Sequence, residues 1–458
     1  MITIMVWDWK MLWRSGLTRR VLLAWLITLV AAMAFGYARA QIYQAAANSA
    51  VSDFAAKQTT LEKDILANTP FARMPLSANG SLVIPIPPLI DIVAGRSDLE
   101  PINAEVNMWT LTHLMFMNYQ IDSPTVLAAG AFDLGFAILY LLPLLIIVLG
   151  YSTLTSERAS GMEKVLQTQA IDLTRLLFAR LLARGLLITA PLLVALLTMY
   201  FISTVDAPER GARLLSVAAM TITYSAFWLS VTAWISARAA TDIRALQLLC
   251  VIWVSLSLLA PALVAAAGRT LYAPPSRFDL LATARRTEID ATLQRDQLLG
   301  AYAHEHPNLS VAGSGSAPAW QKGVIVVTNT VNERLEPLRE RFREQLATQQ
   351  QLTEQLQYVS PVIVLQRVMT ALAGTDETRY LDMRRQAAEF LLSLRHGIEQ
   401  LAMADQELTV ENLRALPRFE LVPQTLHATG FRVLRALLVI GVMSTAIGTF
   451  SRVRPREE

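Results

Sequence analysis

The sequence has little charge and almost no cysteine. Only 17% of its 458 residues are charged, whereas 53% are hydrophobic and the mean hydropathy is +0.38. Soluble domains carry about a quarter charged residues, so about two or three soluble domains in a chain of this length should hold more charge. The single cysteine, Cys250, excludes an intrachain disulfide scaffold. A net charge of +3 does not favour a nucleic-acid partner. The composition predicts an integral membrane protein with substantial polar parts.

Six stretches of the chain are free of charge and long enough, or nearly so, to cross a bilayer, which needs about 20 helical residues. We therefore predict an all-α polytopic membrane protein with six transmembrane helices. These are residues 21–38, 132–155, 185–205, 214–237, 245–268 and 431–451. The last stretch spans the membrane only if Arg432 and Arg435 extend their side chains to the interface.

The basic residues predict the orientation of these spans. With an inside N-terminus, the short connections on that side hold 14 lysines and arginines, whereas the longer segment 39–131 holds five. Because short cytoplasmic loops carry the excess of basic residues, we expect both termini, including the tail 452–458, in the cytoplasm. Arg432 and Arg435 depart from this rule, since they fall on the outer side.

The N-terminal residues 1–20 are predicted to form an amphipathic helix on the membrane surface. Trp9 and Trp13 fall near one face and Lys10 and Arg14 opposite, and aromatic side chains favour the interface. The alternative is a simple extension of the first span. Residues 38–40 could also be a signal-peptidase site, but the long polar lead favours an uncleaved anchor.

Two polar segments are expected outside the membrane. Residues 39–131 begin with a helical stretch, 41–66, and continue as a proline-rich loop. Residues 269–430 form a large, mainly helical extracytoplasmic domain. Its helical stretches are predicted at 278–302, 336–358 and 376–404, with Pro337 in the first turn of the second. On the inner side, 156–184 is predicted to form short helices that dock a cytosolic partner.

Motifs for nucleotide, metal or nucleophilic chemistry are missing. The sequence has no Gly-Lys dipeptide and therefore no P-loop. His304 and His306 could ligate a metal, but no paired Cys/His spacing completes a site, so a solvated loop is the preferred interpretation. Cys250 lies within a span and no G-x-S-x-G elbow occurs. We therefore expect no enzyme activity and no cofactor in this chain.

Asp133 is the acid of most interest, because it lies at the outer end of the second span. An ionisable group close to the membrane suggests a role in a transport pathway. The structural alternative, which we prefer, is that it caps the helix N-terminus, where the helix dipole favours an anion.

Several short stretches resemble a known family. Residues 130–134 with 140–146 resemble the second span of ABC-2-type transporter permeases, and 156–162 resembles the Glu-Arg-Glu-x-Gly-Thr segment that leads into their coupling helix. Ala159 and Met162 depart from that pattern. Residues 360–361 and 371–376, followed by Arg379, resemble the subgroup with a large extracytoplasmic domain of unknown function between spans five and six. The similarity extends over most of the chain.

The resemblance implies a type V exporter-like permease that pairs with a second, identical or homologous permease and with two copies of a cytosolic ABC ATPase. The ATPase would bind ATP and Mg. Glu157, Arg158, Gly161 and Leu166 would couple the chain to it. We thus expect a permease subunit, more an exporter than an importer, in the bacterial inner membrane. The alternative is a membrane-anchored sensor or scaffold whose outer domain binds a ligand or partner.

Overall fold

The computed structural model describes residues 2–111, 115, 132–168, 172–271, 277–305 and 319–451. Six of its helical segments are long and apolar enough to cross a membrane, the number predicted from the sequence. They are Gly16–Leu66, Leu134–Ala159, Leu173–Ile202, Arg210–Arg238, Asp242–Gly268 and Leu426–Phe450. The prediction of a mainly helical, multi-pass membrane protein is confirmed at this level.

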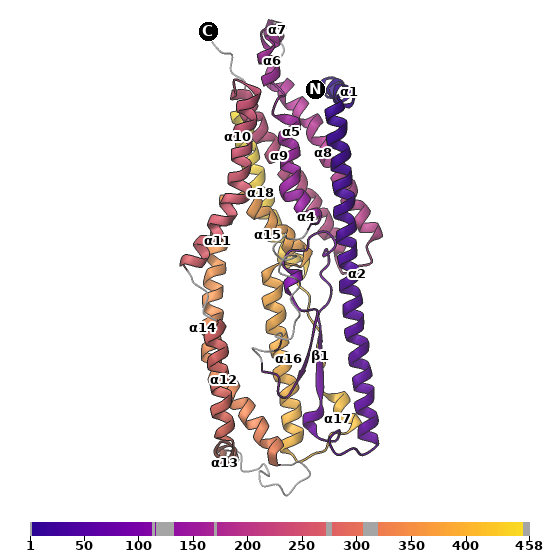
Figure 1. Ribbon diagram of the computed structural model, residues 1–458, viewed down its shortest axis with the longest axis vertical. Helices are drawn as coiled ribbons and strands as arrows, with labels where there is room; N and C mark the ends of the chain where they lie inside the picture. Colours follow the sequence, from indigo (N-terminus) through magenta and orange to yellow (C-terminus); the bar gives the residue numbers. More distant parts are fainter. Residues whose placement is uncertain are drawn as a thin grey trace.

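The elements of the span bundle follow the chain order. They are α1 (Ile2–Arg14), α2 (Gly16–Leu66), α4 (Leu134–Phe136), η3 (Ala137–Leu141), α5 (Leu142–Gly150), α6 (Thr155–Ala159), α7 (Met162–Thr168), α8 (Leu173–Ile202), α9 (Arg210–Arg238), α10 (Asp242–Val254), η4 (Ser255–Leu259), α11 (Ala260–Leu271) and α18 (Leu426–Phe450). Figure 1 places α1, α6, α7 and the end of α18 at one end of an elongated molecule. We call this the coupling end.

The head occupies the opposite end and is built from both polar segments. Its elements are η1 (Pro75–Ser77), β1 (Asn79–Val83), η2 (Ser97–Leu99), β2 (Asn103–Asn107), α12 (Arg277–Leu293), α13 (Arg295–Glu305), α14 (Ala319–Leu356), η5 (Gln357–Val359), α15 (Pro361–Ala373), α16 (Glu377–Met403) and α17 (Val410–Ala415). The two strands pair antiparallel, with Ser81 opposite Glu105. Helix α16 packs on this small sheet through the buried side chains of Phe390 and Leu394.

Helix α2 joins the first span to the head without a break. Ser15 separates it from α1, and the Ser15 hydroxyl accepts a hydrogen bond from the backbone N–H of Thr18 at 3.4 Å, as a helix N-cap does. The 51 residues of α2 make it ~75 Å long, far more than the ~30 Å of a bilayer core. The span and the polar helix predicted at 41–66 are therefore one rigid element.

One expectation for the head is wrong. Helix α14 begins at Ala319, so Pro337 lies inside the helix rather than in its first turn. Proline removes one backbone hydrogen-bond donor from the helix. The residues before Pro337 include Ile325 and Val331, which are buried, and their packing stabilises the helix despite the lost bond. The helical stretch predicted at 278–302 is confirmed as two consecutive helices, α12 and α13.

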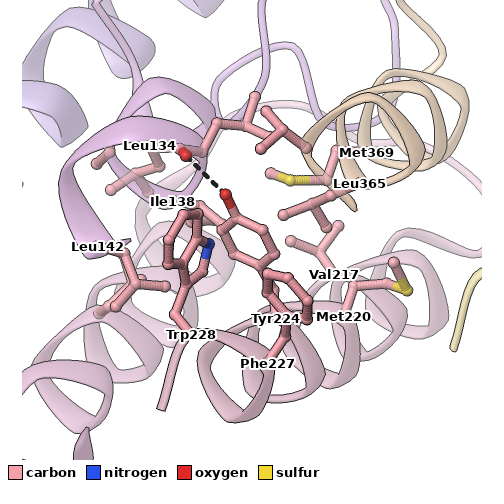
Figure 2. Close-up of a cluster of buried hydrophobic side chains, with 14 of the residues drawn as sticks. Leu134, Ile138, Leu142, Val217, Met220, Tyr224, Phe227, Trp228, Leu365 and Met369 are labelled. Atoms are coloured by element: carbon pink, nitrogen blue, oxygen red, sulfur yellow. Dashed lines mark hydrogen bonds between the residues drawn. The ribbon is translucent and has the colours of Figure 1, made fainter. Parts of the chain in front are cut away.

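The main apolar core extends from the spans into the head. Figure 2 shows side chains of α4, η3 and α5 packed against Tyr224, Phe227 and Trp228 of α9, with Leu365 and Met369 of α15 completing the cluster. Helix α15 belongs to the head in sequence, yet its apolar face is buried against the spans. The head is thus seated on the span bundle through a continuous core.

Spans two and five each contain one turn of π-helix, η3 and η4. Such turns disturb the regular backbone ladder and often mark functional positions. The Tyr224 hydroxyl donates to the Leu139 carbonyl at 3.0 Å, and the Ser360 hydroxyl donates to the Leu256 carbonyl at 2.7 Å. Each irregular turn is therefore satisfied by a side chain from another helix, as apolar surroundings require.

Candidate coupling site

The coupling segment is a short helical hairpin at the coupling end. Helices α6 and α7 meet at Gly161, whose φ of +73° lies in the left-handed region that favours glycine. A Cβ at this position would meet no atom within 4 Å, so the backbone conformation, and not crowding, accounts for the glycine. Figure 1 shows α7 projecting at the tip of the molecule.

Arg158 fixes this hairpin to the end of span four. Its guanidinium donates to the backbone carbonyls of Ser236, Ala237 and Ala239, at 3.1, 2.7 and 2.7 Å, and forms an ion pair with Glu163 at 2.8 Å. These carbonyls belong to the C-terminal turn of α9, where the helix leaves acceptors unpaired and favours a cation. Arg158 therefore faces the bundle, and its side chain is only 10% exposed.

Glu157 fixes the other side of the hairpin to span three. Its carboxylate pairs with Arg180 of α8, and Arg180 also lies 3.9 Å from the carboxylate of Asp8 in α1. Arg184, one turn further along α8, pairs with Asp8 at 3.4 Å. The same guanidinium donates to the carbonyl of Leu149 and the hydroxyl of Thr153, both at 2.6 Å. This network joins α1, the end of α5, α6 and α8.

Helix α7 exposes an apolar strip. Met162 and Val165 of α7 are 48% and 49% exposed, and Leu166 beside them is half-buried. The structure thus divides the four predicted coupling residues. Glu157 and Arg158 hold the hairpin, Gly161 forms its turn, and only Leu166 adjoins the face available to a partner.

Asp133 lies at the other end of span two and is 4% exposed. One carboxylate oxygen accepts from the backbone N–H of Phe136 at 2.8 Å, which is the N-cap bond of α4. The other oxygen accepts from the N–H of Ala94 at 2.7 Å and lies 3.9 Å from Arg39. These contacts are those of the capping alternative, and they also hold residues 85–99 against the span.

Residues 371–376 and Arg379, which carried part of the family resemblance, form a corner between α15 and α16. Gly374 ends α15 with φ +70°, and Asp376 caps α16 by accepting from the N–H of Arg379 at 3.3 Å. Arg379 donates to the carbonyls of Gly374 and Pro85, the latter at 2.6 Å. Burial lowers the pKa of Arg379, opposed by the charges of Glu100 and Asp376. This corner, with residues 85–99 and α15, is the head junction.

No group of three or more histidine, cysteine or carboxylate side chains suited to a metal occurs in the described part of the chain. His306 lies outside the described residues, so the predicted loop around it has no structural account. The same holds for residues 130–131, for residues 169–171 within the predicted inner segment, and for the tail 452–458.

Sequence reasoning missed the partners of the coupling segment. Asp8 is a single acid within the amphipathic N-terminal stretch, and Arg180 and Arg184 are two of the 14 cations counted for the inner side. Their spacing of four residues, which puts both on one face of a helix, was the available signal. The carbonyl acceptors of α9 leave no trace in the sequence.

The match with a known protein family lies in the head. Residues 277–421 match a family model described as a domain of unknown function, DUF3526. The matched region lies between the fifth and sixth candidate spans. No curated protein and no solved structure matches the chain. A domain of unknown function therefore fills the position that the sequence predicted for the large outer domain.

Proposed function

We propose that the chain is the membrane-spanning permease subunit of an ABC transporter and works as an exporter in the bacterial inner membrane. A separate cytosolic ATPase supplies the energy and binds ATP and Mg. The observation that carries the proposal is the α6–α7 hairpin: it projects from the span bundle, exposes an apolar strip, and is tied to spans three and four by Glu157 and Arg158. Because the sequence has no P-loop, an ATP-driven transporter built on this chain needs a docking element for a separate ATPase.

The contacts of the hairpin suggest how force on it is transmitted. A push on α7 reaches α9 through Arg158 and α8 through Glu157, because both ion-paired arginines are largely buried. Spans three and four move with it, while α1 follows through Asp8. In this proposal the coupling end and both termini lie in the cytoplasm, and the head lies outside.

A second permease, identical or homologous, completes the proposed assembly. Only 17% of the most apolar window of span five is buried within the chain, against 61% for span two. Spans one and six are nearly as exposed, each with 22% of its most apolar window buried, so spans one, five and six offer apolar surfaces to a second permease and to lipid.

The proposal is tested by co-purification with an ATPase encoded beside this chain. Val165→Asp places a charge on the exposed face of α7, and we expect at least a tenfold loss of co-purified ATPase, equivalent to about 1.4 kcal/mol. The matched control is Leu293→Asp, a similar change at a residue of α12 that is 81% exposed. It should retain the ATPase. Equal retention by both variants, or no ATPase with the unmodified chain, would favour a sensor or scaffold instead.

A further inference from the structure

A cavity of about 780 Å³ opens where the head meets spans five and six. Its walls come from α11 at the head end of span five, α14, α15, the start of α16 and the start of α18. Gly95 and Arg96 of the first polar segment close one side. Ligand sites commonly have volumes of ~300–1,000 Å³, so the space suits a small molecule or one end of a lipid.

Arg432 and Arg435, the two cations that depart from the basic-residue rule, line this cavity from span six. Arg432 lies 3.8 Å from the carboxylate of Asp376, a long contact, and Arg435 lies over the ring of Tyr358 at 4.6 Å. Among the described residues, Arg435 has no carboxylate within ion-pair distance. The cavity gives these two cations an environment in common.

Arg367 of α15 adds a third guanidinium to the same wall. It reaches Glu354 at 3.4 Å, while its Nη1 atom is buried without a hydrogen-bond partner in the described part of the chain. Burial lowers the pKa of Arg367, the charge of Glu354 opposes this, and the neighbouring charge of Arg432 lowers it further. A buried donor without a partner is costly. An anion placed here would satisfy it and relieve the repulsion between the two arginines.

The wall nearest span five is apolar, whereas the sides formed by α14 and α16 carry polar and acidic residues, among them Gln349, Glu354 and Glu377. Pro261, Val264 and Ala265 come from span five, and Val364 and Val368 come from α15. Phe431, at the start of span six, is 72% exposed at the rim. A guanidinium cluster thus lies beside an apolar wall at the height where a bilayer changes from hydrocarbon to headgroups.

We propose that this cavity binds an anionic amphiphile, with its phosphate or carboxylate headgroup at Arg367, Arg432 and Arg435 and its acyl chain along the apolar wall of span five. Arginine suits this role because its planar donor fork matches such oxyanions. The site stands independently of the proposed ATPase partner, since it depends only on residues at the head end.

The test is a lipid titration of the purified full-length chain, followed by native mass spectrometry. Dioctanoyl phosphatidylglycerol is compared with phosphatidylcholine of the same chain length. We expect the anionic lipid to bind about tenfold more tightly, and the double variant Arg432→Gln/Arg435→Gln to lose that preference. The matched control is Arg20→Gln/Arg244→Gln, which changes two exposed arginines at the coupling end of spans one and five. This control variant should keep the preference for the anionic lipid. Equal binding of both lipids to the unmodified chain, or an equal loss in the control, would overturn the proposal.

Two further arms of the titration distinguish a site for an amphiphile from a site for small anions. Inorganic phosphate should not displace the lipid at matched concentration; if it does, the cavity is a site for small anions and the proposal is wrong. Phe431→Ala leaves every charge in place and should weaken binding of the anionic lipid about threefold by reducing apolar contact. If the double arginine variant does not fold, this variant decides: unchanged binding would contradict a role for the apolar wall.

Discussion

The two ends of the span bundle both gather arginines, but they use them differently. At the coupling end, Arg158 and Arg184 reach backbone carbonyls at 2.6–3.1 Å and carboxylates at 2.8–3.4 Å. At the head end, Arg379 also donates to backbone carbonyls, but Arg367 and Arg432 on the cavity wall reach carboxylates only at 3.4 and 3.8 Å. The same residue type closes one end of the bundle and leaves the other able to accept a ligand.

This difference teaches what the arginines contribute to each end. Those at the coupling end are structural, because removing one leaves buried carbonyls or carboxylates without a partner. Arg367, Arg432 and Arg435 on the cavity wall are loosely satisfied, so their loss should affect binding more than stability. Four comparisons of variants test this distinction.

The largest effect is expected from Arg158→Gln. The change removes three bonds to the end of α9 and the pair with Glu163, so we expect a loss of about 4 kcal/mol in stability. Arg435→Gln at the cavity should cost less than about 1 kcal/mol. Thermal unfolding of both purified variants in detergent gives the comparison. Similar losses in the two variants would remove the distinction between the ends.

Glu100→Gln should stabilise the head junction in a pH-dependent way. Burial raises the pKa of Glu100 to about 7 from 4.5, with Arg379 and Arg96 opposing the rise, and its Oε1 atom is buried without a partner in the described chain. The unfolded chain ionises first, so this carboxyl reduces stability as pH rises from 4.5 to 7, and the full cost applies above pH 7.

The neutral amide should therefore gain about 3 kcal/mol at pH 8 and almost nothing at pH 4.5. The melting temperatures of both forms across this range measure the gain. If the stability gain of Glu100→Gln does not change with pH, the gain does not come from the ionisation of Glu100.

Two of the three left-handed glycines in the described chain separate crowding from backbone strain. Gly374→Ala would place a Cβ 2.9 Å from Pro88 in addition to the strained φ, whereas Gly161→Ala meets nothing. We expect losses of about 2 and about 1 kcal/mol, respectively. Chemical denaturation of the two variants measures this difference. Equal losses would mean that the turn at Gly374 is less tightly packed than described.

The smallest effect is expected in the middle of the bundle, between the two ends. Tyr224→Phe leaves the Leu139 carbonyl of the π-turn without its donor and should cost about 1 kcal/mol. Tyr200→Phe, on a more exposed tyrosine of span three, is the control and should be neutral. The melting temperatures of both variants decide, and a neutral Tyr224→Phe would mean that another donor satisfies the turn.

The number of spans could be predicted from the sequence because charge is excluded from a bilayer. The separate N-terminal helix could be predicted from its amphipathic pattern. The continuity of α2 could not, since polar residues after Arg39 mark the end of the membrane and not the end of the helix. The start of α14 was also missed, because packing of Ile325 and Val331 outweighed the proline signal. Long-range packing decided both cases.

For the coupling site, the sequence indicated the segment but not the direction of its side chains. Glu157 and Arg158 were assigned together to a partner surface, yet both face the chain itself, because helix ends and paired charges nearby provide acceptors that no local pattern reveals. The only sequence feature that pointed to the cavity was the departure of Arg432 and Arg435 from the basic-residue rule. The carboxylate of Asp133 accepts from two backbone N–H groups, those of Phe136 and of Ala94, and the second of these lies 39 residues away, which no local pattern shows.

The most direct test of the central claim is site-specific photo-crosslinking from Val165 in the intact membrane, with Leu293 as the matched position in the head. The account predicts that the Val165 probe captures a protein with a P-loop, identified by mass spectrometry, and that the Leu293 probe does not. Capture of no such ATPase at Val165, or equal capture at both positions, would contradict coupling through the α6–α7 hairpin.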